Sequence, residues 1–195
     1  MARSKEFEEN EVLEKAMKLF WEQGYEKTSM NDLVERMGIH RRSLYDTFTD
    51  KHTLFLKAMD RFRERIDTRL VAGVKQSESA REALRFVFSF IINGEEDSPP
   101  GCMCVNSAVE MAMRDADVDA KAIKAFTDTE RLFAGIVSWG QQSGEFTKKY
   151  EATELAEYLH NAVTGIRVMA RTSVPKEKLW RIAEFTMHIL EPQDG

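Results

Sequence analysis

Several residue types are scarce in this chain of 195 residues, and each shortage excludes a class of protein. Only two cysteines occur, Cys102 and Cys104, which are too few for a disulfide framework and too close together for the usual zinc spacing. The four histidines show no metal-ligand spacing, and the sequence has neither a phosphate-binding glycine loop nor a nucleophile elbow. We therefore expect no metal, no cofactor and no enzymatic activity.

Long hydrophobic runs are missing as well. The N-terminus lacks the apolar stretch of a signal peptide, and the richest apolar run, residues 86–92, is far too short to cross a bilayer. We therefore expect a cytoplasmic protein with no membrane partner. Positive charge is in the minority, since the formal net charge is -5. A broad basic surface is thereby excluded, and any contact with nucleic acid must be local.

Helix-forming residues dominate the chain instead. Proline is absent before Pro99 and no strand-like alternation appears, so we predict an all-α fold. Apolar periodicity and capping residues predict about nine helices. Their expected ranges are residues 6–23, 30–37, 41–48, 51–71, 80–92, 102–114, 117–142, 151–171 and 175–191, with a soft connection at residues 73–79.

The second and third of these helices form a recognisable pattern. Ser29 and Asp32 have the spacing of a capping box, which begins a short helix that Gly38 ends. Another short helix follows from Arg41. A short helix, a tight glycine turn and a second short helix are typical of the helix-turn-helix, in which the second helix enters the major groove of DNA.

Residues 12–59 resemble the DNA-binding region of the TetR family of one-component bacterial regulators. The resemblance rests on an ordered set of spaced residues: Phe20, Gly24, Tyr25, Thr28, Ser29, Gly38, Ile39, Leu44, Tyr45, Phe48, Lys51 and Leu54. It implies a three-helix DNA-binding domain at residues 1–52 and a helical ligand-binding and dimerisation domain at residues 53–195. It also implies a homodimeric repressor that a small hydrophobic or aromatic effector releases from a palindromic operator of double-stranded DNA.

Six residues are the predicted DNA contacts. Arg41, Arg42 and Ser43 begin the second helix of the motif, where an arginine can donate two hydrogen bonds to guanine. Tyr45 and Lys51 stand at positions where family members commonly touch the DNA backbone. Ser29 and Lys51 begin helices, whose exposed amides attract phosphate. Arg42 stands where the family often has a small residue or proline, so the operator sequence cannot be carried over from relatives.

Candidate effector contacts come from the central helices. Aromatic and methionine side chains at helical spacing are usually core, whereas Glu110 and Asn161 would need polar partners if they face an apolar interior. The predicted set is Phe90, Met103, Ser107, Glu110, Met111, Phe126, Phe133, Trp139 and Asn161.

Two alternatives to this function stay open at this point. Cys102 and Cys104 stand near the predicted start of a helix, which favours a thiolate, so the regulator could instead sense oxidants or electrophiles. The other alternative is an all-helical enzyme or an interaction module that does not bind DNA.

Overall fold

The computed structural model describes residues 2–95 and 97–192, with side chains from residue 9 onward. Within these residues the chain forms nine helices and no strand, which confirms the predicted all-α fold. The helices are α1 (Ala2–Gln23), α2 (Met30–Met37), α3 (Arg41–Phe48), α4 (Lys51–Gln76), α5 (Ala80–Asn93), α6 (Met103–Met111), α7 (Ala116–Ser143), α8 (Ala152–Met169) and α9 (Lys176–His188). Among the described helices, none combines the length and the apolar character that crossing a membrane requires.

Local capping explains where several helices begin. The Ser29 hydroxyl accepts a hydrogen bond from the Asp32 amide, and the Asp32 carboxylate accepts one from the Ser29 amide, which completes the predicted capping box of α2. The Ser79 hydroxyl caps α5 by accepting a hydrogen bond from the Glu82 amide, whereas the Glu82 carboxylate accepts the Glu78 amide, so α5 begins with a single cap and no reciprocal box. These contacts satisfy amides that have no partner inside the helix, so the sequence alone locates these helix starts.

The prediction for α4 was wrong at its C-terminal end. We expected the helix to stop near residue 71 and a soft connection to begin at Gly73, but α4 continues to Gln76. A Cβ atom at position 73 would lie 2.0 Å from Cζ of Phe86 on α5. Gly73 is therefore a point of close approach for an aromatic ring rather than a helix terminator, and this packing favours the extra turn.

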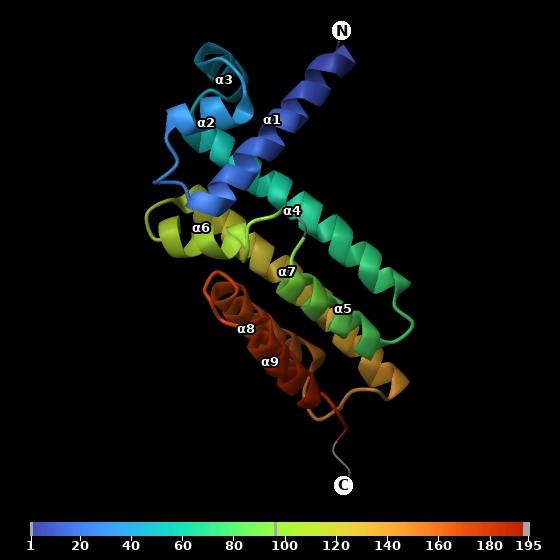
Figure 1. The fold of residues 1–195 in the computed structure, drawn as a ribbon. Helices are drawn as coiled ribbons and strands as arrows, with labels where there is room; N and C mark the ends of the chain where they lie inside the picture. The colour runs from blue at the N-terminus through green and yellow to red at the C-terminus, as the bar shows by residue number, and fades with distance from the viewer. Residues whose placement is uncertain (1, 96, 193–195) are drawn as a thin grey trace. The chain divides into compact units, whose positions relative to one another are not determined.

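The chain divides into two compact units, which are described separately. Unit 1 comprises Met1–Ile66 and Cys102–Ala122, and so holds α1, α2, α3 and α6 with the beginnings of α4 and α7. In this unit α2 packs between α1 and α3, as Figure 1 shows, and α6 packs against α1. Its core is fully buried and includes Met17, Phe20, Leu33, Leu44, Phe48 and Phe55.

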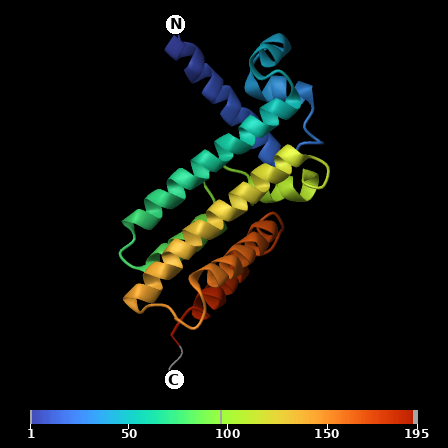
Figure 2. The ribbon, with the colours of Figure 1, turned by 180° about the vertical axis from the view of Figure 1, so that it is seen from behind.

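Unit 2 comprises Asp67–Gly101 and Ile123–Gly195. It holds α5, α8, α9, the end of α4 and most of α7. Helices α8 and α9 lie side by side, as Figures 1 and 2 agree, and both pack against α5. The residues at the centre are apolar and completely buried: Leu84, Val87, Phe88, Phe133, Val137, Leu159, Val163, Ile166 and Ala183.

Candidate nucleic-acid interface

The turn between α2 and α3 fixes the direction of the second motif helix. Gly38 ends α2 in the left-handed conformation, with φ 72° and ψ 32°, and its amide donates to the Val34 carbonyl. A side chain disfavours this conformation, whereas glycine adopts it readily. Helix α3 then buries Leu44 and Phe48 against the rest of unit 1. Because these two residues lie one turn apart, the opposite face of α3 is left to solvent.

The exposed surface of α3 carries four of the six predicted DNA contacts. Arg41, Arg42, Ser43 and Tyr45 are all exposed, and the Arg41 guanidinium lies 5.9 Å from the centre of the Tyr45 ring. The Arg42 side chain is 93% exposed, and its Nε atom is 3.8 Å from Oδ2 of Asp46, a distance too long for a strong hydrogen bond. An ion pair exposed to this degree contributes little to stability, so both arginines can exchange their present contacts for DNA.

The start of α4 supplies a third cation beside α3. The Asp50 carboxylate accepts from the Thr53 amide at 2.7 Å, and this backbone hydrogen bond lowers the pKa of Asp50. Lys51 follows, and its ammonium nitrogen lies 4.2 Å from the centre of the Tyr25 ring. Ser29 is exposed at the start of α2, and a hydroxyl that accepts a hydrogen bond can still donate its own proton. The roles of these residues on DNA remain predictions.

Glu110 is held by a contact that the sequence did not reveal. Its two carboxylate oxygens accept the backbone amides of Tyr25 and Glu26, each at 2.9 Å. Arg114, one turn further along the chain, pairs with Glu26 at 3.2 Å. Helix α6 thus binds the backbone of the turn that follows α1. The Tyr25 ring in that turn contacts Lys51. No local pattern signals this pairing, because the partners are 85 and 84 residues apart in sequence.

His52 and Asp115 make a second long-range contact within unit 1. Nε2 of His52 lies 2.7 Å from Oδ2 of Asp115, while Oδ1 of Asp115 accepts the amides of Asp117 and Val118 at the start of α7. His52, Asp115 and Asp117 have possible ligand atoms within 4.8 Å of one another. Both Asp115 oxygens are engaged as a helix cap and a histidine partner, which accounts for the cluster without a metal ion.

The predicted effector contacts are divided between the two units. Unit 1 holds Met103, Ser107, Glu110 and Met111. Ser107 is buried and its hydroxyl donates to the Met103 carbonyl within α6 at 2.8 Å. Because the Glu110 carboxylate holds two amides, the expectation of an unsatisfied polar group aimed at a ligand does not apply to it.

Unit 2 holds Phe90, Phe126, Phe133, Trp139 and Asn161. Phe133 is completely buried, while Phe90, Phe126 and Trp139 are partly buried. Asn161 is exposed on α8, so the argument that it needs a partner in an apolar interior fails. Its use as an effector contact in the monomer loses that support.

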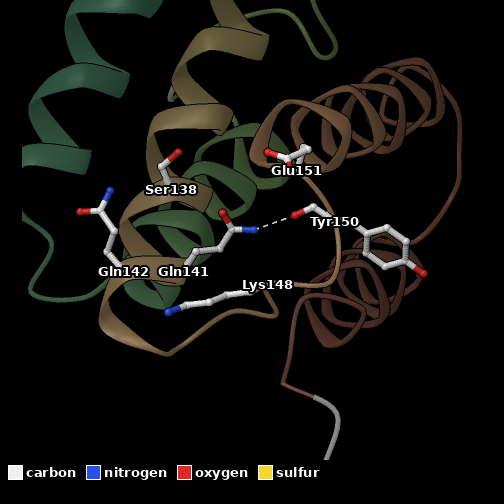
Figure 3. A pocket seen from close by; sticks show the side chains of 6 residues that line it. All are labelled: Ser138, Gln141, Gln142, Lys148, Tyr150 and Glu151. Atoms are coloured by element: carbon white, nitrogen blue, oxygen red, sulfur yellow. Dashed lines mark hydrogen bonds between the residues drawn. The ribbon is translucent and has the colours of Figure 1, made fainter.

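An open polar pocket lies at the end of α7 and is lined by Ser138, Gln141, Gln142, Lys148, Tyr150 and Glu151 (Figure 3). The Gln141 amide nitrogen donates to the carbonyls of Tyr150 and Thr147, at 2.9 and 3.0 Å. Gln141 therefore ties down the connection to α8. The pocket includes none of the predicted effector contacts.

Cys102 and Cys104 are both buried, with 4% and 1% of their surface exposed, and no disulfide joins them. Cys102 occupies the N-cap position of α6, as predicted for a thiol near a helix start, but its side chain makes no capping hydrogen bond. Burial limits the access of an oxidant to either sulfur.

An exposed cationic face on the second helix of a helix-turn-helix, joined to a separate helical unit, defines a DNA-binding regulator. Comparison with known proteins identifies the family of this regulator. Residues 12–58 match the model of bacterial regulatory proteins of the tetR family, and residues 80–185 match that of the tetracyclin repressor-like C-terminal domain. The chain belongs to the TetR family of transcriptional regulators. This membership also removes the enzyme alternative.

Individual relatives agree with this assignment over nearly the whole chain. The HTH-type transcriptional repressor ComR of Escherichia coli (strain K12) is 33% identical over 190 residues, which cover 96% of this chain and 90% of ComR. A TetR-family regulator from Cytophaga hutchinsonii shares the fold, with a TM-score of 0.87 at 21% identity over 100% of this chain and 99% of its own. A cysteine-substituted form of the regulator CifR, solved with 26-base-pair operator DNA, has a TM-score of 0.82 at 26% identity, covering 93% of this chain and 95% of its own.

Proposed function

We propose that this protein is a cytoplasmic repressor that binds a palindromic operator as a homodimer and leaves it when a small effector binds. The observation that carries the proposal is the surface of α3, where Arg41, Arg42, Ser43 and Tyr45 are exposed while Leu44 and Phe48 are buried. The name of ComR as a repressor and the operator DNA bound to CifR support it. Residues 1–52 serve as the DNA-binding domain, and residues 53–195 serve for effector binding and dimerisation.

Binding by so few cations has a measurable consequence. The net charge of -5 provides no general attraction to DNA, so affinity rests on Arg41, Arg42, Lys51 and the helix starts near Ser29 and Lys51. Each phosphate contact displaces counterions and adds about 0.9 to the slope of log K against log salt. We expect a slope that corresponds to a few contacts per half-site.

The dimer is formed by the outward faces of α8 and α9. Tyr158, Gly165 and Val168 lie on an exposed stripe of α8, and Phe185 on α9 is 67% exposed. No atom would lie within 4 Å of a Cβ at position 165, so a second chain can approach the α8 backbone there. A shallow hollow along α9 is lined by Glu177, Trp180, Arg181, Glu184, Phe185 and His188. Two recognition helices then meet one face of the duplex, with half-sites about 34 Å apart or a multiple of that.

The effector binds in residues 53–195 and is small and largely hydrophobic or aromatic. Support comes from the aromatic side chains inside unit 2, among them Phe126 and Phe133. Release from DNA requires that the effector bind the non-DNA conformation more tightly than the DNA-bound one, because only differential affinity shifts an equilibrium.

The deciding experiment is the selection of bound duplexes from a random library by the purified full-length protein at several salt concentrations. We expect enrichment of an inverted repeat, and absence of any enrichment at low salt would overturn the proposal. Transcription from a promoter that carries the selected repeat, measured with and without the protein, separates repression from activation.

A thiol-based sensor is the second candidate, favoured by the N-cap position of Cys102, where helix amides stabilise a thiolate. The burial of both sulfurs makes it the weaker of the two. Replacement of Cys102 and Cys104 by serine tests it: release of the selected operator by an electrophile such as N-ethylmaleimide should disappear, and unchanged release rejects the idea.

A further inference from the structure

Helix α8 carries a polar stripe on its buried side. His160, Thr164 and Arg167 occur at spacings of one helical turn, so they share one face of the helix. His160 is 8% exposed and Arg167 is 6% exposed. Oγ1 of Thr164 is buried and has no hydrogen-bond partner in the part of the chain that the structure describes. Buried polar groups are normally satisfied within a protein, so a stripe with unsatisfied members needs an explanation.

One end of this stripe is balanced within unit 2. Nδ1 of His160 lies 3.0 Å from a carboxylate oxygen of Glu130 on α7, and the Phe126 ring stands 5.1 Å from the imidazole. The negative charge of Glu130 is therefore committed to His160. The same end of the stripe presents an aromatic surface through Phe126.

The other end of the stripe carries positive charge without compensation. Among the residues that the structure describes, no carboxylate, carbonyl or aromatic ring pairs with the Arg167 side chain. Glu95, an acid of the loop after α5, is paired with Arg69 at 2.5 Å.

The energetic balance of Arg167 favours the binding of an anion. Complete burial of an unpaired charge costs several kcal/mol even after the protein relaxes, and Arg167, which is 6% exposed, carries a part of that cost. Arg167 lies in the last turn of α8, where the helix dipole favours a cation by about 0.3–1 kcal/mol. The dipole therefore offsets only part of the cost, and a bound carboxylate would offset the remainder through two parallel hydrogen bonds.

We propose that the effector is a small organic acid, whose carboxylate binds Arg167 and Thr164 and whose apolar body lies toward Phe126. The guanidinium donates to the two carboxylate oxygens, and the Thr164 hydroxyl donates a third hydrogen bond. This site deepens the proposed function, on which it rests, by giving the effector a chemical class. One guanidinium and one hydroxyl suit a single negative charge better than a doubly charged phosphate.

The test uses the full-length protein and matched pairs of probes: 4-phenylbutyrate with 4-phenylbutyramide, and octanoate with octanamide. Isothermal titration calorimetry should show at least one acid binding about tenfold or more tightly than its own amide, because only the acid can form the charged pair. Arg167→Met should reduce this preference to about twofold or less, and Thr164→Val should reduce it in part. Arg131→Met, a change of an exposed arginine on α7, is the matched control and should keep the preference.

Two outcomes would overturn the acid site. One is equal binding of each acid and its amide, including no binding of either, and the other is an undiminished preference in Arg167→Met. Thermal unfolding without a probe adds an independent measurement. Arg167→Met should leave Tm unchanged or raise it because a buried unpaired charge is removed, whereas a large fall would mean that the guanidinium has a structural partner.

Operator binding on the same samples separates this inference from the proposed function. Without a probe, Arg167→Met should bind the selected inverted repeat as tightly as the natural chain does. If the natural chain prefers the acid but binds no repeat, the proposed function fails and the acid site stands. If it binds the repeat but shows no acid preference, the reverse holds.

Discussion

The two units place their arginines in opposite surroundings. In unit 1, Arg41 and Arg42 stand at the start of α3 with their side chains in water. In unit 2, Arg167 is buried on α8, on the same face as His160 and Thr164. An exposed cation without a partner costs the fold little free energy because water solvates it. It suits a large polyanion that binds at the surface. A buried cation is costly when unpaired and suits a small ligand that the protein encloses.

The same two units share one structural device. In unit 1 the Glu110 carboxylate accepts the amides of Tyr25 and Glu26. In unit 2 the Glu145 carboxylate accepts the amides of Ala80 and Arg81, at 3.2 and 3.0 Å, at the start of α5. The hydrogen bond from the Arg81 amide is the main cause of the lowered pKa of Glu145. Each unit is thus secured by a carboxylate that holds two successive amides, but only in unit 1 does the held turn contact a predicted DNA-binding residue.

The largest expected effect comes from the exposed cations of unit 1. Replacement of Arg41 and Arg42 together by alanine should lower affinity for the selected operator by about a hundredfold or more, since each bidentate base contact contributes about 1–3 kcal/mol. Fluorescence anisotropy at fixed salt measures the loss. Acid binding in unit 2 should not change. Arg85→Ala, which removes an exposed arginine of unit 2, is the control, and an equal loss in that variant would contradict the assignment.

The proposed dimer surface of unit 2 gives the next largest effect. Phe185→Glu places a charge on an apolar face that dimerisation would bury, so it should weaken the dimer by about thirtyfold or more, the scale of an interface hot spot. Analytical ultracentrifugation over a range of concentrations measures this change. Ile123→Glu alters another exposed apolar residue, on α7, and should leave the dimer intact. Equal dissociation in both variants would place the interface elsewhere.

The paired carboxylates give a smaller effect that differs between the units. Glu110→Gln and Glu145→Gln each replace a charged acceptor of two amides, so each should lower the free energy of unfolding by about 1–2 kcal/mol. Only Glu110→Gln should also weaken operator binding, by several fold, because it loosens the turn that holds Tyr25 beside Lys51. Denaturant unfolding and anisotropy on the same samples test both statements. A matching loss of affinity in Glu145→Gln would show that general destabilisation is the cause.

The smallest effect concerns acid pH in unit 1. Burial by itself raises the pKa of Asp115, but hydrogen bonds from the Val118 amide and with His52, together with the charge of His52, outweigh burial and lower this pKa. A lowered folded-state pKa stabilises the fold above the unfolded value of about 3.9, and this contribution is lost as pH falls through the folded value. The stability difference between the natural chain and Asp115→Asn should therefore shrink below about pH 4. A constant difference between pH 7 and pH 3 would exclude this role.

Much of the predicted helix pattern rested on local sequence signals. Ser29 and Asp32 mark the start of α2, Gly38 marks its end, and both features involve residues within one or two helical turns. Helix number and the helix-turn-helix followed from such signals, because capping and periodicity depend on near neighbours along the chain. The exposure of Arg42 could be expected for the same reason, since Leu44 and Phe48 define the buried side of α3.

Long-range packing decided the rest. Asn161 and Thr164 are both polar and lie on α8, and the sequence does not say which of them faces inward. Helix α8 packs against α5 and α9, and His160 on α8 contacts Glu130. These contacts turn Thr164 toward the interior of unit 2 and leave Asn161 exposed. The partners of Glu110, the amides of Tyr25 and Glu26, are likewise distant in sequence, so local patterns do not predict them.

The sequence by itself determined an all-α TetR-family regulator and the position of its helix-turn-helix, and it predicted the DNA contacts on α3. These features follow from interactions between neighbours in the chain. Only the tertiary structure decided that α4 passes through Gly73, that Glu110 holds the turn after α1 and that Arg167 is buried. The physical reason is that burial and pairing depend on which helices pack together, and helical periodicity alone does not select those partners.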